Sequence, residues 1–232
     1  MTALDARAPL NGDDSTPWLL SKLSVPKGAF LVPRRHLFDR LTQGAGGPLT
    51  VVSGPAGCGK TTLVASWIAH DLAPGRIAWL TLDPQDNDAV TFWTNFVEAL
   101  VLHGLELPLH GRWPTDSLPR HSFLEDLSAA LDRSDETVVV VLDGFEAITD
   151  AAIQRDLDLL LRLTASDLRL VLTTRSPPRG LLNSYRLTGE LTVIRTRAVS
   201  SDGGRQLAEH RRRVLDNRRP VPDEDGPRGE LG

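Results

Sequence analysis

Short apolar runs alternate with longer stretches of helical spacing along most of the chain. The runs are rich in β-branched residues and have the length of buried strands, at 48–54, 76–82, 137–143, 168–174 and 191–195. Between them, apolar residues recur every three or four positions, which predicts helices at 60–72, 92–101, 123–131 and 153–161. Nearly continuous apolar strands are typical of parallel sheets covered on both faces. The pattern therefore predicts an α/β fold, with a mainly parallel five-stranded sheet and helices on both faces.

The pattern weakens at both ends of the chain and in one internal stretch. Residues 1–20 are polar and interrupted by Pro, Gly and Asp, so we expect a disordered leader there. Residues 104–119 carry enough Gly and Pro to be a loop or an insertion. We expect the folded domain to cover 21–200, followed by a short helix and a disordered polar tail over 201–232.

Composition describes one globular domain with tails. The chain has 232 residues, of which 41% are hydrophobic and 24% charged, enough to bury a full core. A single cysteine, Cys58, excludes an internal disulfide framework and a multi-cysteine zinc site. The first residues lack the apolar segment of a secretory signal, and no apolar run reaches the ~20 residues that span a bilayer. We therefore expect a cytoplasmic protein that does not enter a membrane.

Charge gives no general attraction to nucleic acid or to anionic lipid, because the formal net charge is −4. The exception is a basic cluster, His210–Arg219, in the expected tail. An acidic stretch follows this cluster, and it has neither interleaved aromatic residues nor a helix-turn-helix pattern. We read it as a solvated tail and do not expect this chain alone to bind DNA directly.

One motif carries the strongest functional signal. The segment GPAGCGKTT, at 54–62, fits G-x-x-x-x-G-K-[ST] at every fixed position, between a predicted strand and a predicted helix. In such a P-loop, glycines turn backbone N–H groups toward a phosphate, at the positive end of the following helix. Lys60 would reach the β- and γ-phosphates, and the Thr61 hydroxyl would bind Mg²⁺. The predicted nucleotide-binding residues of the loop are Gly54, Pro55, Ala56, Gly57, Cys58, Gly59, Lys60, Thr61 and Thr62.

Cys58 has two interpretations inside this loop. It is either a small residue at a variable position, or a thiol near a helix N-terminus with a lowered pKa. In the second case, its oxidation would block phosphate binding. The first interpretation is the default.

The strand at 137–143 ends in a carboxylate, Asp143, at the edge of the sheet where ligands bind in open α/β folds. Together with the P-loop, this position predicts that Asp143 holds Mg²⁺, with Thr61 as the second metal-binding side chain. Hydrolysis also needs a group that activates water. In P-loop ATPases this group is often the acid directly after the metal-binding Asp, and here that position is Gly144. Glu146 is the remaining candidate for the catalytic base.

These segments together resemble the nucleotide-binding domain of STAND signal-transduction ATPases, particularly that of the large ATP-binding LuxR-type bacterial transcription regulators. The likeness rests on the first segment Ser21–Leu41, the P-loop and the tryptophan of its helix, and the W-L-x-L-D…D-N-D…F-W pattern within Ala78–Leu100. The strand and prolines that follow, Leu168–Leu191, add a Thr-Arg pair. The resemblance implies ATP and Mg²⁺ as ligands and places Arg175 near the γ-phosphate.

The chain departs from the family pattern in two respects. Gly144 stands where members usually have a second acid, and Glu146 where many have a histidine. The likeness also fades near 197–204, so the winged-helix, helical-repeat and helix-turn-helix parts of the family are absent from this sequence.

Three functions fit these residues. The first is a nucleotide-dependent switch in bacterial signalling or transcription control, with ATP and ADP as ligands and slow hydrolysis at most. The second is an enzyme, either an active ATPase with Glu146 as base or a phosphotransferase. The third is a truncated, non-catalytic chain that pairs with a second copy of itself or with related regulator chains. We expect the first.

Overall fold

The computed structural model describes residues 17–27, 35–106, 120–134, 136–164, 167–177 and 179–197. All of them lie in the first of the two units into which the chain divides, Met1–Arg197. The second unit, Ala198–Gly232, lies outside the described residues, as does most of the loop expected at 104–119. The short helix, the polar tail and the basic cluster of the sequence analysis therefore stay predictions.

Five short apolar strands form one sheet in the order β2-β3-β4-β1-β5, and every pairing is parallel. The strands are β1 Leu49–Ser53, β2 Arg76–Thr81, β3 Val138–Asp143, β4 Leu168–Thr174 and β5 Leu191–Arg195. Every residue of β1 and of β3 is buried, as expected of strands that are covered on both faces. The predicted five-stranded α/β fold is confirmed, and the sheet is wholly parallel rather than mainly so.

The helices follow the predicted alternation and add to it. They are α1 Pro17–Lys22, α2 Arg35–Ala45, α3 Lys60–Ala69, α4 Ala89–Leu102, α5 Arg120–Leu131, α6 Ala151–Leu163 and α7 Arg179–Thr188. Two single turns of 3-10 helix, η1 Pro84–Asn87 and η2 Phe145–Ala147, follow β2 and β3. The predicted helices correspond to α3, α4, α5 and α6. Three helices, α1, α2 and α7, are additions to the predicted pattern.

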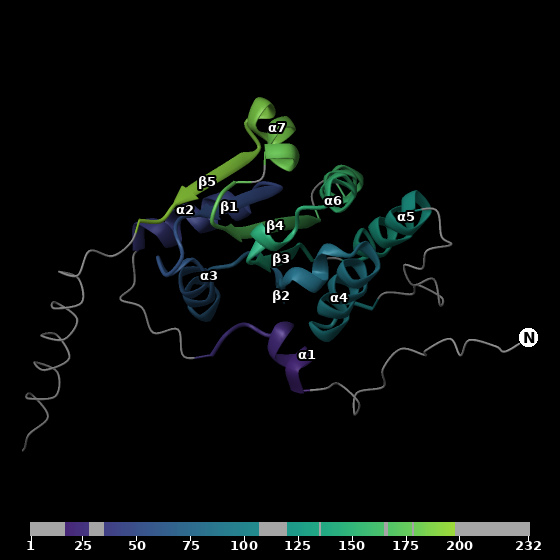
Figure 1. Ribbon diagram of the computed structural model, residues 1–232, viewed down its shortest axis with the longest axis horizontal. Helices are drawn as coiled ribbons and strands as arrows, with labels where there is room; N and C mark the ends of the chain where they lie inside the picture. The colour runs from purple at the N-terminus through teal and green to yellow at the C-terminus, as the bar shows by residue number, and fades with distance from the viewer. Residues whose placement is uncertain are drawn as a thin grey trace, which may run out of the picture. The chain divides into compact units, whose positions relative to one another are not determined.

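The two faces of the sheet carry separate apolar cores. Side chains alternate along β3, so that Val139 and Val141 lie in one core and Val138, Val140 and Leu142 in the other. The first core is completed by α2 and α3, and the second by α4, α5 and α6. Figure 1 shows α3 on one side of the sheet and α4, α5 and α6 grouped on the other.

Helix α1 corrects part of the expected leader. It begins at Pro17, inside the segment 1–20, and it buries Leu19 in the core together with Leu23 just beyond its end. The Lys22 ammonium is buried with it, 2.8 Å from the Asp83 carboxylate and 2.7 Å from that of Asp86. This segment is ordered because an apolar contact and a buried ion pair hold it against the body of the domain.

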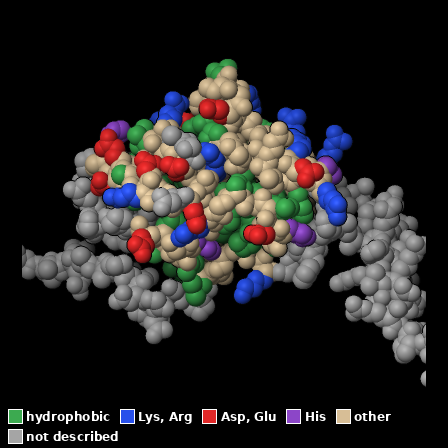
Figure 2. Space-filling model, turned by 180° about the vertical axis from the view of Figure 1, so that it is seen from behind, with side chains coloured by type: hydrophobic (Ala, Val, Ile, Leu, Met, Phe, Trp, Pro, Cys, Tyr) green, Lys and Arg blue, Asp and Glu red, His purple; other side chains and the backbone are tan. Residues whose placement is uncertain are grey.

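One face of the described residues mixes charges of both signs. On the face seen in Figure 2, acidic and basic side chains are interspersed with small apolar areas. Such a surface produces no strong field of one sign. Within the described ranges, none of the helices has the length and apolarity needed to cross a bilayer.

Candidate functional site

All strands run in the same direction, so their carboxyl ends meet at one edge of the sheet. The residues at this edge are the loop after β1, Asp83 after β2, Asp143 at the end of β3, Arg175 after β4 and Thr196 after β5. Open parallel sheets bind ligands at this edge. The candidate site therefore lies here.

The loop between β1 and α3 has the backbone that its glycines allow. Gly57 and Gly59 have left-handed φ values of 73° and 80°, and Gly59 caps the N-terminus of α3. A residue with a Cβ is strained in this conformation, so these two glycines shape the loop. Pro55, Ala56 and Gly57 are exposed on it. The first turn of α3, which holds Thr61 and Thr62, begins directly after the loop.

The Lys60 ammonium lies on the inner side of the loop, where it contacts the loop backbone. It donates hydrogen bonds to the carbonyl oxygens of Gly54, at 2.8 Å, and of Pro55, at 3.0 Å. The side chain is buried, with 9% of its surface exposed. The one buried cation of the loop is thus held within the curve of the backbone that is expected to receive phosphate.

The base of the loop rests on the residue that follows β5. The Cys58 sulfur lies 2.8 Å from the Thr196 hydroxyl oxygen, and Thr196 donates its N–H to the Ser53 carbonyl at 2.8 Å. A Cβ on Gly54 would lie 2.4 Å from the Thr196 carbonyl oxygen, so this position has no room for a side chain. Cys58 is buried, which favours its interpretation as a packing residue over that of an oxidation-prone thiol.

Asp143 is the centre of a buried hydrogen-bond network. The Thr61 hydroxyl donates to its Oδ1 at 2.8 Å, and the Thr173 hydroxyl donates to the same atom at 2.5 Å. Burial raises the pKa of the Asp143 carboxyl, the hydrogen bonds from Thr173 and Thr61 lower it, and the negative charge of Glu146 raises it further. The charge of Lys60 lowers the same pKa, so both charges act on this carboxyl.

The contact between Thr61 and Asp143 fits a magnesium site. The two residues are far apart in the sequence, and the fold brings a hydroxyl and a carboxylate into contact beside the loop. Both are hard oxygen donors of the kind Mg²⁺ takes, and a nucleotide-bound Mg²⁺ needs only one or two protein ligands besides phosphate and water. Among the residues that the structure describes, no group of three His, Cys, Asp or Glu side chains could hold a metal by itself.

Gly144 has a backbone that suits glycine and little else. Its φ is 84° and its ψ 36°, in the left-handed region, and a Cβ here would lie 3.3 Å from the Leu82 carbonyl oxygen. Its N–H donates to the Thr173 hydroxyl at 3.0 Å, and that hydroxyl in turn donates to Asp143. The position where an acid was expected is therefore shaped to hold the Asp143 network.

Glu146 and Arg175, which the sequence suggested as catalytic base and phosphate contact, bind each other. The Arg175 guanidinium Nε lies 2.9 Å from Glu146 Oε1, and the Arg175 backbone N–H donates to Glu146 Oε2 at 3.2 Å. Both carboxylate oxygens are thus engaged by one residue. The side chains are 32% and 65% exposed, so this ion pair faces the solvent side of the site.

Two further residues of this edge were not predicted. Thr173 lies near the end of β4, and its contact with Asp143 depends on the pairing of β4 with β3, which the sequence does not indicate. Asn87 accepts hydrogen bonds from the backbone N–H groups of Thr149, at 2.7 Å, and Asp150, at 2.8 Å. It therefore ties η1 to the segment that follows η2, which no spacing in the sequence indicates.

Taken together, the sheet and its edge define a P-loop nucleotide-binding domain of the α/β class. The chain belongs to the AAA ATPase domain family, which it matches over residues 35–173. It is 31% identical over 196 residues to the serine/threonine-protein kinase PknK of Mycobacterium tuberculosis, a match that covers 81% of this chain and 17% of that protein. It is 30% identical over 224 residues to the HTH-type transcriptional regulator MalT of Yersinia enterocolitica, covering 91% of this chain and 23% of MalT.

The likeness to MalT confirms the resemblance to bacterial transcription regulators. The chain spans about a fifth of the length of these relatives. Solved structures of similar fold include Cdc6p from Pyrobaculum aerophilum, with a TM-score of 0.58 and 20% identity, covering 86% of this chain and 54% of Cdc6p. The Aeropyrum pernix ORC1 protein, solved in complex with DNA, has a TM-score of 0.52 and 17% identity over 85% of this chain and 53% of its own. At such identity the two structures support the fold alone.

Proposed function

We propose that this chain is an ATP-binding regulatory module that works as a nucleotide-dependent switch and hydrolyses ATP slowly at most. The observation that carries the proposal is the contact of Thr61 with Asp143 beside the loop, while neither candidate for water activation is free. Gly144 has no side chain, and Glu146 is bound by Arg175. Among the described residues of this edge, the groups proposed for binding are present, and neither of the two candidate bases is available.

The residues of 54–62 would hold the phosphates through backbone N–H groups and the positive end of α3. Lys60 would exchange the carbonyl oxygens of Gly54 and Pro55 for phosphate oxygens, a stronger charge-assisted contact. Thr61 and Asp143 would hold Mg²⁺, which neutralises phosphate charge when bound. Arg175 would contact the third phosphate and so distinguish ATP from ADP.

The likeness to the relatives suggests the process in which the switch acts. MalT is a transcriptional regulator, so we propose control of transcription or of another bacterial signalling step, in the cytoplasm, with partners among regulator chains or a second copy of this one. We propose 21–200 as the nucleotide-binding domain.

Binding and turnover, measured together, test the proposal. We expect Mg²⁺-dependent binding of ATP and a kcat well below ~1 s⁻¹, the lower end of ordinary enzymes. Lys60→Ala should weaken the binding of both ATP and ADP roughly ten- to a hundredfold, because it removes a charged hydrogen-bond donor. Lys27→Ala, an exposed lysine outside the loop, is the matched control and should change nothing.

Two results would contradict the switch. A kcat of ~1 s⁻¹ or more would make the chain an ordinary ATPase. Lack of nucleotide binding by the unmodified chain would remove the basis of the proposal and would favour a purely structural interaction role.

A further inference from the structure

Thr196 has contacts with the P-loop that the proposed function leaves unexplained. It follows β5, an edge strand that pairs with β1 so that Arg195 lies opposite Ser53, the last residue before the loop. Thr196 is buried, although Arg195 and Arg197 on either side of it are exposed. A residue just beyond an edge strand is buried here because it packs against the base of the loop.

The Thr196 hydroxyl connects the start of the loop with its middle. It donates to the Ser53 carbonyl oxygen at 3.3 Å, and it lies 2.8 Å from the Cys58 sulfur. A hydroxyl has one proton, so while it donates to the carbonyl it accepts from the Cys58 thiol. The Thr196 backbone N–H gives the same carbonyl a second hydrogen bond, at 2.8 Å. One residue therefore holds both Ser53 and Cys58.

The Cys58 sulfur also contacts the cation of the loop. The Lys60 ammonium donates to this sulfur at 3.9 Å, in addition to its hydrogen bonds with two loop carbonyls. The sulfur thus lies between the Thr196 hydroxyl and the ammonium that is proposed to bind phosphate. A displacement of Cys58 therefore changes the surroundings of Lys60 as well.

The loop is packed tightly at its base and is open at its tip. A Cβ on Gly54 would overlap the Thr196 hydroxyl oxygen and would lie 2.9 Å from the Cys58 sulfur, so these three residues fill the base. A Cβ on Gly57 or on Gly59 would meet nothing within 4 Å beyond its chain neighbours. The described contacts therefore support the loop at its base rather than at its tip.

We propose that Thr196 is a positioning residue for nucleotide binding, which acts through Cys58 to hold the P-loop in the form that receives phosphate. This inference rests on the proposed function. A loop that is already shaped for its ligand loses less conformational freedom on binding. Without the Thr196 hydroxyl, the loop is in this form for a smaller fraction of the time, and the apparent affinity falls by that fraction.

The size of the effect follows from the hydrogen bonds that the hydroxyl makes. Thr196→Val keeps the shape of the side chain and the backbone hydrogen bond to Ser53, but it removes both contacts of the hydroxyl. A neutral hydrogen bond changes an equilibrium by roughly two- to tenfold, and a contact with sulfur is of the weaker kind. The binding of ATP and of ADP should therefore weaken by about three- to tenfold. The ratio of the two affinities should stay the same, because both nucleotides carry the phosphates that the loop is proposed to hold.

A purely structural role for Thr196 gives a different result. If the hydroxyl only stabilises the fold, Thr196→Val lowers the urea midpoint and leaves both dissociation constants unchanged. Thr196→Ser keeps the hydroxyl and removes only the methyl group. It should restore most of the affinity if the hydroxyl positions the loop.

The experiment measures dissociation constants of ATP and ADP with Mg²⁺ for the unmodified chain, Thr196→Val, Thr196→Ser, Cys58→Ala and the double variant with Cys58→Ala and Thr196→Val. Urea unfolding of each variant establishes that it is folded. The matched control is Thr192→Val, the same substitution four residues earlier, where β5 lies opposite Thr50 and not beside the loop.

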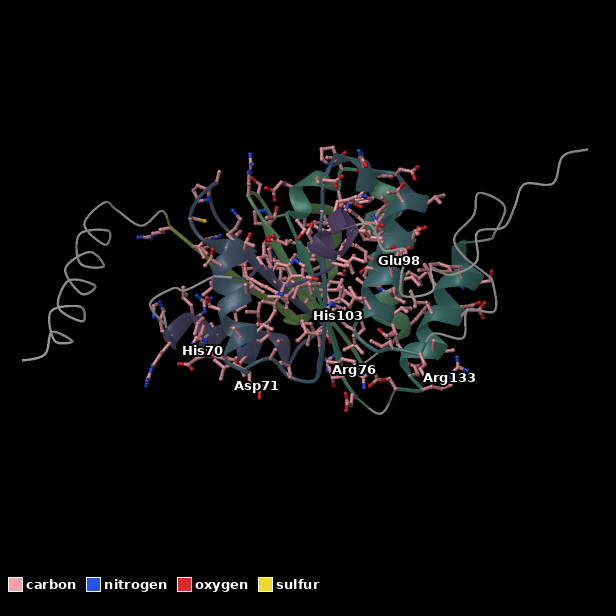
Figure 3. All side chains as sticks on the ribbon, turned by 90° about the horizontal axis from the view of Figure 1, so that it is seen from below. His70, Asp71, Arg76, Glu98, His103 and Arg133 are labelled. Atoms are coloured by element: carbon pink, nitrogen blue, oxygen red, sulfur yellow. The ribbon has the colours of Figure 1, made fainter. Side chains whose placement is uncertain are left out.

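A second control tests whether the loss of any surface contact weakens binding. Glu136→Gln breaks the ion pair between Glu136 and Arg76. Arg76 (labelled in Figure 3) begins β2, at the edge of the sheet opposite the P-loop. This variant should bind both nucleotides as the unmodified chain does.

We expect Thr196→Val and Cys58→Ala each to weaken the binding of both nucleotides about three- to tenfold, with Thr192→Val unchanged. Because the two single variants remove the same contact, the double variant should bind nearly as well as the weaker of them. If Thr196→Val does not fold, Cys58→Ala decides the question, because it removes this contact from the side of the loop.

Four results would overturn the inference while leaving the switch intact. These are unchanged dissociation constants in Thr196→Val, an equal loss in Thr192→Val, a Thr196→Ser variant as weak as Thr196→Val, and losses that multiply in the double variant. Absence of nucleotide binding by the unmodified chain would contradict the proposed function, and this inference with it.

Discussion

Gly144 offers the sharpest test of why this site lacks a second acid. Its φ of 84° lies in the left-handed region, which L-residues with a Cβ avoid. The perturbation is Gly144→Glu, which supplies the acid that related proteins are expected to carry, together with Gly144→Ala, which adds a Cβ alone.

The magnitude has two parts. The left-handed conformation costs a residue with a Cβ roughly 1–2 kcal/mol. In addition, the new Cβ would lie 3.3 Å from the Leu82 carbonyl oxygen, so the backbone must shift by a few tenths of an ångström. Turning the residue to a negative φ would relieve both problems, but it would pull the Gly144 N–H from the Thr173 hydroxyl, which holds Asp143. Both variants should therefore lose about 1–2 kcal/mol of unfolding free energy or slightly more.

Urea unfolding followed by tryptophan fluorescence measures this loss. With an m-value of about 2 kcal/mol/M, the midpoint should fall by about 0.5–1 M. The matched control is Gly189→Ala, because Gly189 has a similar φ of 77° and open space where its Cβ would lie. The control reports the conformational cost alone. The urea midpoint of Gly144→Ala should therefore fall at least as far as that of Gly189→Ala.

Turnover completes the test. We expect the kcat of Gly144→Glu to stay well below ~1 s⁻¹, because an acid at a strained position disturbs Asp143, the residue proposed to hold Mg²⁺. An unchanged urea midpoint in Gly144→Ala would refute the argument from backbone strain. A stable Gly144→Glu with turnover above ~1 s⁻¹ would refute the argument that the fold excludes an acid there.

Two other perturbations test the buried charges. Lys22→Met should lower the unfolding free energy by about 3–5 kcal/mol, because it leaves the buried Asp86 carboxylate without its ion-pair partner. The control is Lys27→Met, at an exposed lysine. A loss below about 1 kcal/mol for Lys22→Met, measured by urea unfolding, would contradict this account. Asp143→Asn should stabilise the metal-free protein at neutral pH, since burial raises the pKa of the carboxyl in the folded state. The folded state then binds the proton more tightly than the unfolded state, so the advantage of the Asn variant should shrink as the pH falls from 7 toward about 4. Urea titrations in EDTA measure this difference, and an advantage that grows toward acid pH would refute the assigned cause. In the same variant, ATP affinity should no longer increase with Mg²⁺.

Local sequence spacing was sufficient to predict most of the strands and helices and the loop at 54–62. The four valines before Leu142 indicate a buried strand from their composition alone; the strand was predicted at 137–143, and β3 covers Val138–Asp143. The motif at 54–62 needs only a strand before it and a helix after it, and both are set by nearby residues. Helix α1 was missed because its six residues form no apolar repeat, and its order comes from Lys22 binding a pair of carboxylates that lie about sixty positions away.

The contacts of the site depended on the order of the strands. Because β4 lies between β1 and β3, Thr173 comes to the Asp143 carboxyl, and Arg175 comes to Glu146. Sequence spacing carries no information on this order, since parallel strands are joined by crossovers that allow several arrangements. The sequence by itself therefore determined that the residues predicted to bind phosphate and magnesium lie at strand ends, which a parallel sheet brings to one edge. Only the tertiary structure decided that the expected base and the expected phosphate sensor are bound to each other, because that pairing arises from two neighbouring strand ends.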